Sequence, residues 1–140
     1  MIPVIMKGTP KGMIVIYNDG SQKEVAQRPE KYLEEACLKH GSTMEGREQA
    51  FRYLTDSLQK AAVLVNEEKH ELWFPTVSKS CENCEWIAYY NLLRVCRRQE
   101  NTSEIIFDNG FRAVVNCSIR TMNLQRKRCQ AFLTKICQNS

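Results

Sequence analysis

Cys81 and Cys84 are the only closely spaced cysteine pair in the sequence, and they lie between its two tryptophans, Trp73 and Trp86. A Cys-x-x-Cys pair has the spacing of half a tetrahedral zinc site, which needs two further ligands. The remaining cysteines and both histidines are isolated: Cys37, Cys96, Cys117, Cys129, Cys137, His40 and His70. We therefore interpret the pair as two loop thiols, expect no metal and no cofactor, and keep a small zinc-stabilised module as an alternative.

No set of residues in the sequence has the spacing of an active site. His40 and His70 have no serine, cysteine or carboxylate at a spacing diagnostic of a catalytic dyad. Neither standard glycine-rich pattern for binding phosphate is present. The sequence therefore predicts a protein that is not an enzyme and has no catalytic residues.

Positive charge is concentrated in the second half of the chain. Residues 1–78 carry 10 Lys or Arg against 11 Asp or Glu, whereas residues 79–140 carry 10 against 5. Most of these cations are arginines, whose forked donors suit phosphate groups and base edges. The candidate DNA-binding residues are Arg47, Arg94, Arg97, Arg98, Arg112, Arg120, Arg126, Lys127 and Arg128. A solvated polar helix face, or a protein–protein interaction module or inhibitor, remains the alternative.

The elements that must position these residues form an α+β fold. β-branched and aromatic runs predict antiparallel strands and hairpins in one or two small sheets. A pair of helices is expected over about 29–60, and an amphipathic helix capped by Ser118 over about 118–138. The expected strands cover residues 3–6, 13–17, 22–26, 62–65, 71–74, 86–98, 105–107 and 111–115. We expect one domain, residues 1–140, without internal repeats.

Two of these assignments depend on residue patterns that allow more than one interpretation. Residues 86–98 suit either a helix or a long strand, and we predict a strand because the hairpin around Asp108-Asn109-Gly110 needs a third partner. The second helix is expected to continue to about residue 60, because an apolar stripe does so. That stripe consists of Met44, Phe51, Leu54, Leu58 and Ala61.

The chain has no membrane-spanning or export signal. No apolar run approaches the roughly 20 residues that cross a bilayer. Residues 1–6 are too short for a signal peptide, and seven cysteines without an export signal suggest reduced thiols. We therefore expect a cytoplasmic protein with no membrane partner.

Three blocks of residues resemble the ComK family of competence transcription factors. The first is Cys37-x-x-x-Gly41-Ser42-x-x-x-Gly46-Arg47. The second runs from Phe74-Pro75-Thr76 through Ser78 to Cys84-x-Trp86-Ile87, and the third is Phe107-Asp108-Asn109-Gly110. Together they cover roughly residues 13–135, in a short, divergent member that is expected to lack the family's C-terminal extension.

The resemblance implies a bacterial transcriptional activator that binds double-stranded, AT-rich DNA. It further implies contact largely through the minor groove by an assembly of more than one copy, a homo-oligomer on DNA. Arginines inserted into a narrow A-tract groove suit that mode of binding. Arg47 is the one candidate that lies within a family block, and the other eight candidates rest on charge alone.

Overall fold

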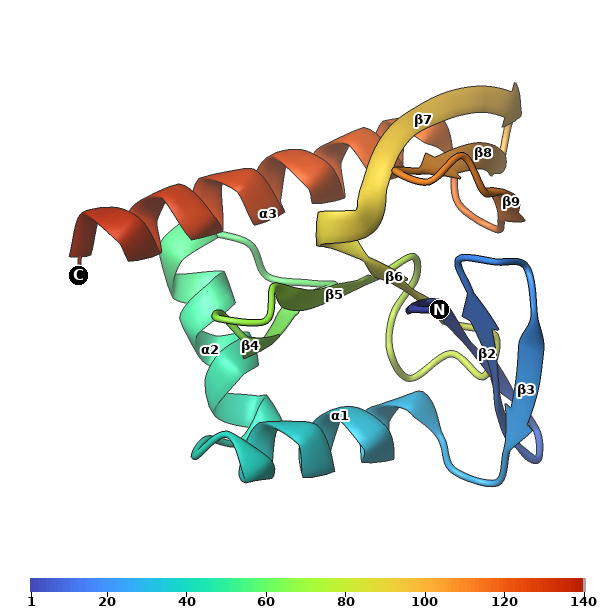
Figure 1. The fold of residues 1–140 in the computed structure, drawn as a ribbon. Helices are drawn as coiled ribbons and strands as arrows, with labels where there is room; N and C mark the ends of the chain where they lie inside the picture. The colour runs from blue at the N-terminus through green and yellow to red at the C-terminus, as the bar shows by residue number, and fades with distance from the viewer. Residues whose placement is uncertain (140) are drawn as a thin grey trace.

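The computed structural model describes residues 1–139, which form three α-helices and two antiparallel sheets (Figure 1). The elements are β1 Pro3–Thr9, β2 Gly12–Tyr17, β3 Gln22–Val25, α1 Pro29–Lys39, α2 Met44–Thr55, β4 Val63–Asn66, β5 Glu71–Pro75, β6 Glu85–Ala88, a 3₁₀ turn η1 Tyr89–Asn91, β7 Leu92–Gln99, β8 Thr102–Phe107, β9 Arg112–Val115 and α3 Ile119–Asn139. The first sheet has the order β3-β2-β1-β6-β5-β4 and the second the order β7-β8-β9. The predicted α+β class, with antiparallel strands in one or two sheets, is confirmed.

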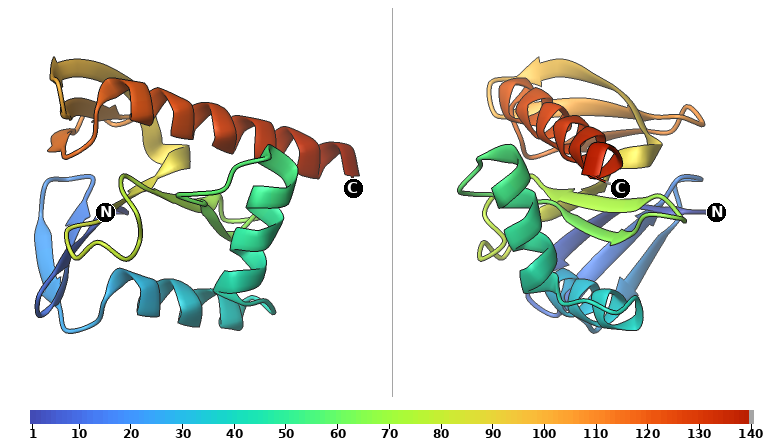
Figure 2. Two further views of the ribbon diagram at one scale, coloured as in Figure 1. Left: turned by 180° about the vertical axis from the view of Figure 1, so that it is seen from behind. Right: turned by 90° about the vertical axis from the view of Figure 1, so that its left-hand side faces the viewer.

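The helices α1 and α3 lie on opposite sides of the molecule, with the strands of the first sheet between them (Figures 1 and 2). Helix α2 joins the two sides, and the rings of Phe51 on α2 and Phe132 on α3 are 5.1 Å apart. One cluster of buried apolar side chains runs from β1 through both sheets to α3. Both tryptophans belong to it, since Trp73 is 2% and Trp86 is 0% exposed.

The prediction of a single strand over residues 86–98 is wrong. β6 lies inside the first sheet between β1 and β5, and β7 belongs to the second sheet, where it pairs with β8. The 3₁₀ turn η1 separates them and changes the direction of the chain. β7 does supply the third strand that the hairpin of β8 and β9 needed, so that part of the prediction is confirmed.

The predicted helical pair is present, but α2 ends earlier than expected. Helix α1 stops where Gly41 adopts a φ of +80°, and the Thr43 side chain caps α2 by accepting from the Gly46 N–H. Helix α2 ends at Thr55 because Asp56 takes a left-handed conformation, with φ of 52°. Leu58 consequently lies in a loop and is 89% exposed, so its assignment to the helical stripe is wrong.

The C-terminal helix matches its prediction closely. The Ser118 side chain accepts from the Thr121 N–H, which caps the first turn of α3. The buried face of the helix consists of Met122, Gln125, Cys129 and Phe132. This face packs against α2, β7 and β8, so α3 connects the second sheet to α2.

The expectation of a chain without internal repeats is wrong, because the fold contains one. β2, β3 and α1 begin at Gly12, Gln22 and Pro29, and β8, β9 and α3 begin 90 residues later in each case. The strand pairing follows the same offset, so that Ile16 faces Gln22 as Ile106 faces Arg112. Between residues 12–32 and 102–122, identical residues occur at only three positions: Ile16 and Ile106, Gly20 and Gly110, Val25 and Val115.

The two repeats contact each other through their hairpin turns: the turn between β2 and β3 packs against the turn between β8 and β9. The Asn109 side-chain amide donates to the Asn18 carbonyl oxygen at 2.7 Å. A Cβ atom at Gly20 would lie 3.6 Å from the Phe111 ring, so the second turn packs closely on the first. This contact joins the first sheet to the second sheet at these two turns.

Candidate nucleic-acid interface

Helix α3 carries five basic residues and no acidic residue, which makes it a cationic element. Arg120 and Lys127 are seven residues apart, so they share one face of the helix, and both are exposed. Arg126 is half-buried on the flank beside β7, where its Nη2 donates to the Leu93 carbonyl oxygen at 3.1 Å. This hydrogen bond connects the helix to the start of β7.

The three consecutive basic residues of α3 do not form one patch, because successive residues on a helix point about 100° apart. Arg128 lies on the other flank from Arg126, where its Nη1 donates to Gln125 Oε1 at 3.4 Å. Lys135 also turns away from β7, since its Nζ donates to the Leu54 carbonyl oxygen of α2. Lys127, between the two arginines in sequence, is exposed to solvent.

Strand β7 lies beside α3 (Figure 1), and its Arg94, Arg97 and Arg98 are all exposed. Between residues 94 and 97 the pairing with β8 is regular, so Arg94 and Arg97 point to opposite faces. The register shifts between Arg97 and Gln99, so the simple alternation that would place Arg98 on the face of Arg94 does not hold there.

Arg112 lies two strands away from Arg94 on the same face of the second sheet. Both residues pair with Ile106, which is 8% exposed between them. Arg112 forms an ion pair with Glu104, with its Nη1 3.0 Å from Oε1. Its charge is therefore partly balanced within the protein, unlike the charges of the exposed α3 residues.

Arg47 is not near the other candidates. It lies in the first turns of α2, next to the end of α1, and its Nε donates to Ser42 Oγ at 2.8 Å. Figure 1 shows this end of α2 on the side of the molecule opposite α3. The family block that contains Arg47 thus forms a turn between two helices.

We call the basic residues of β7, together with the basic residues of α3 that do not turn away from β7, the basic surface. Its members are Arg94, Arg97, Arg98, Arg120, Arg126 and Lys127. The sequence identified all six, but the folded chain is needed to separate them from Arg47, Arg112 and Arg128. A polyanion such as a nucleic acid backbone complements a surface of this kind.

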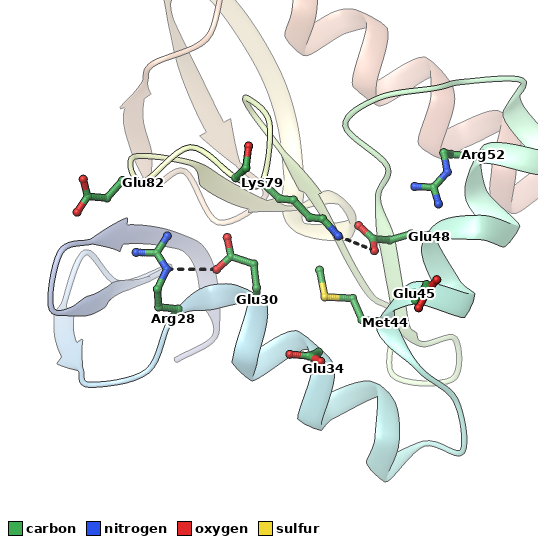
Figure 3. A pocket seen from close by; sticks show the side chains of 10 residues that line it. Arg28, Glu30, Glu34, Met44, Glu45, Glu48, Arg52, Lys79 and Glu82 are labelled. Carbon is green, nitrogen blue, oxygen red and sulfur yellow. Dashed lines mark hydrogen bonds and ion pairs between the residues drawn. The ribbon is translucent and has the colours of Figure 1, made fainter.

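A cleft of opposite character lies between α1, α2 and the loop after β5, and Figure 3 shows its side chains. It has a volume of about 810 Å³ and is lined by Arg28, Glu30, Glu34, Met44, Glu45, Glu48, Arg52, Lys79, Ser80 and Glu82. Lys79 reaches across it to Glu48, with Nζ 2.9 Å from Oε1. Sequence reasoning missed this ion pair, because residues 48 and 79 show no sequence pattern that links them.

The two cysteines of this loop have different environments. Cys81 is exposed, whereas Cys84 is 1% exposed and its Sγ donates to the Val77 carbonyl oxygen. Burial raises the pKa of the Cys84 thiol to about 12, which disfavours the thiolate that zinc binds. Within residues 1–139, no three His, Cys, Asp or Glu side chains are grouped as metal ligands would be.

An α+β fold with an acid-free basic helix beside an arginine-bearing strand belongs to the class of small basic proteins suited to a polyanionic partner. A comparison with protein families identifies the family: the profile described as "ComK protein" matches residues 2–140. The chain therefore belongs to the ComK family, as its motifs indicated. This is a family of transcription factors rather than of enzymes.

Among curated proteins, the chain is similar to the competence transcription factor of Bacillus subtilis (strain 168). The two sequences are 24% identical over 86 residues, which is 61% of this chain and 45% of that protein. The matched region thus spans less than half of the relative's length. No solved structure matches the chain. In the described part of the chain, no helix is both long and apolar enough to cross a bilayer.

Proposed function

We propose that this protein is a transcriptional activator that binds AT-rich double-stranded DNA through its basic surface, largely in the minor groove. The observation that carries the proposal is the acid-free helix α3 held against β7 by the hydrogen bond from Arg126 to Leu93. The arrangement brings six cations together on two neighbouring elements, with Arg94 and Arg97 on opposite faces of β7. Arginines on such a surface can enter a narrow A-tract groove.

The charge distribution supports one orientation on DNA. The cleft on the side of α1 and α2, away from α3, is lined by five glutamates against Arg28, Arg52 and Lys79, so its net charge is negative (Figures 1 and 3). Like charges repel, so this side would be directed away from the phosphate backbone. Each copy would act as one DNA-binding unit, since its buried cluster spans both sheets. More than one copy would bind together on DNA as a homo-oligomer.

The salt dependence of DNA binding tests the proposed surface. Replacing Arg120 and Lys127 by Ala removes two exposed charges of α3. If both contact phosphates, the slope of log K against log salt falls by about 0.9 per contact, or about 1.8 in all. The matched control replaces Lys31 and Lys39 by Ala, two exposed charges of α1 on the other side of the molecule. An equal decrease of the slope in both variants would contradict the assignment of the basic surface as the DNA-binding site.

Groove choice is tested with base analogues. An inosine–cytosine pair lacks the guanine amino group in the minor groove, where it then resembles an A·T pair, while its major groove stays like that of G·C. A minor-groove reader binds an inosine–cytosine duplex nearly as tightly as an AT-rich duplex and binds a G·C duplex less tightly. Binding of inosine–cytosine DNA as weak as that of G·C DNA would contradict minor-groove recognition.

A further inference from the structure

The strands that precede the two repeats, β1 and β7, pair with β2 and β8 in matching registers but differ at their other edge. Beside the first repeat, β1 pairs with β2 on one edge and with β6 on the other. Its residues Ile5, Met6 and Lys7 face Ile87, Trp86 and Glu85 of β6. Beside the second repeat, β7 pairs with β8, and no other strand among residues 1–139 pairs with its far edge.

The internal repeat shows which part of β7 corresponds to the paired part of β1. Ile5 faces Ile16 on β2, and Arg94 faces Ile106 on β8, at the offset of 90 residues between the partner strands. Arg94, Val95 and Cys96 therefore occupy the register positions of Ile5, Met6 and Lys7. These are the positions at which β1 accepts β6.

The free edge of β7 is regular over a limited length. The register shifts between Leu92 and Arg94 and again between Arg97 and Gln99, which leaves residues 94–97 as an uninterrupted segment. Bulges of this kind protect an edge strand from unspecific pairing at its ends. The segment between them has four residues, which is enough to match the pairing of β1 with β6, where three residues of β1 are paired.

Charge decides which kind of strand fits this edge. Antiparallel pairing of β7 with the same segment of a second copy would bring Arg94, Arg97 and Arg98 of both copies together across two adjacent strands, and like charges this close destabilise a sheet. An extended segment with carboxylates would instead face Arg94, Arg97 and the neighbouring Arg98, all of which are exposed. Main-chain hydrogen bonds would supply affinity and the arginines would supply selectivity.

We propose that the edge of β7 at Arg94–Arg97 accepts an acidic, extended segment of a partner protein as a fourth strand of the second sheet, in the place that β6 holds beside β1. The occupant would cover three arginines of the basic surface. Its competition with DNA rests on the proposed function, whereas the strand addition itself does not. Such a partner would inhibit the regulator by occupying its nucleic-acid interface.

The probe is a short fluorescent peptide in which pairs of glutamates alternate with pairs of valines, so that both faces of the added strand carry carboxylates, and it is titrated into the full-length protein. We expect saturable binding that weakens about tenfold in Arg94→Glu, because an attractive charge pair becomes repulsive. Lys31→Glu is the control, since it makes the same charge change on exposed α1. Amide hydrogen exchange should slow at residues 94–97 when the peptide is bound.

Two control peptides separate strand addition from simple charge attraction. The same peptide N-methylated along its hydrogen-bonding edge keeps its charge but cannot extend a sheet, so it should bind at least tenfold more weakly. Equal binding of the methylated peptide, or no binding of the unmodified one, overturns the proposal. A lysine–valine peptide should not bind.

The same protein preparations are also tested for DNA binding, in a separate titration. Peptide binding by a protein that binds no DNA would refute the proposed function and leave the strand addition standing. If AT-rich DNA binds, saturating peptide should reduce its affinity. If saturating peptide left the DNA affinity unchanged, the proposed competition between the peptide and DNA would be wrong.

Discussion

Glu85 is a carboxylic acid buried at the junction of the two sheets. It is 4% exposed and its Oε1 accepts from the Asn116 N–H at 2.8 Å, so it connects β6 to the segment before α3. Burial raises the pKa of Glu85 above its usual value near 4.5, because the charged form loses its hydration. The hydrogen bond from Asn116 and the charge of Lys7 oppose the shift without cancelling it.

Glu85→Gln should therefore change the pH dependence of stability. The folded state holds the Glu85 proton more tightly than the unfolded state, so the stability that this group contributes is fully present below the unfolded pKa and is lost as pH rises through the folded pKa. The variant keeps an oxygen acceptor for Asn116 but has no proton to lose. Urea unfolding at pH 4 and pH 7 should show a gain over wild type that is larger at pH 7. A difference independent of pH would contradict the assignment.

Gln125 is the polar residue on the buried face of α3, where it is 1% exposed. Its Nε2 donates to two carbonyl oxygens, those of Lys60 and Pro75, each at 2.9 Å. Lys60 lies in the loop before β4 and Pro75 at the end of β5. One side chain thus holds α3 against two separate segments of the chain.

Gln125→Leu should destabilise the protein by about 2–3 kcal/mol, because it leaves two carbonyl groups without their donor. Gln130→Leu is the matched control, since it makes the same change at an exposed position of α3 and should stay within about 0.5 kcal/mol of wild type. Chemical denaturation of both variants measures the difference. Similar stabilities for the two would show that the Gln125 hydrogen bonds contribute little.

At the scale of elements, the two repeats depend on turns of the same geometry. In each, the N–H of the last residue of the long strand donates to a carbonyl four residues on, from Tyr17 to Ser21 and from Phe107 to Phe111. Gly20 and Gly110 adopt φ of +87° and +92°, which only glycine reaches without strain. Asp19 and Asn109 occupy the same position and each accepts a backbone N–H two residues on.

Two substitutions, Asn109→Asp and Asp19→Asn, test the contact between these turns. Asn109→Asp keeps the acceptor for the Phe111 N–H but removes the amide that donates to Asn18, and it places a carboxylate beside that carbonyl oxygen. We expect a loss of about 1 kcal/mol or more. Asp19→Asn keeps its acceptor for Ser21 and should be nearly neutral. Thermal unfolding compares the two variants, and equal melting temperatures would contradict a role for the contact.

At the scale of the whole molecule, α3 links a first sheet that contains both tryptophans to a second sheet that contains none. Phe132 packs its ring 5.1 Å from that of Phe51 and is 2% exposed, so it lies in the shared core. If the chain folds as one unit, tryptophan fluorescence and far-UV circular dichroism should report the same unfolding transition.

Phe132→Ala should lower the free energy of unfolding by about 3–5 kcal/mol, as expected for a large cavity in a packed core. Because both sheets share this core, the transitions seen by fluorescence and by circular dichroism should shift together. Separation of the two transitions in the variant would show instead that the second sheet and α3 unfold independently of the first. Leu133→Ala, at a half-buried neighbouring position, should cost less.

Local chemistry in the sequence determined most of the elements. Pro29, Gly41, Thr43 and Ser118 are helix start and stop signals that act within one turn, so α1, the start of α2 and α3 were predictable. The Asp108-Asn109-Gly110 turn specified its hairpin for the same reason. Family membership followed from short motifs and needed no folded structure.

Only the tertiary structure decided which strands pair with one another and which side chains lie together on the surface. Residues 86–98 form two strands because β6 fills the space between β1 and β5, and no residue within the segment encodes that competition. The internal repeat is carried by backbone register and turn geometry, which many side chains satisfy, so sequence identity does not reveal it. The sequence supplied nine basic candidates, but their grouping depended on the direction of each side chain around α3 and on the exposed edge of β7. Those directions depend on packing between residues far apart in the chain.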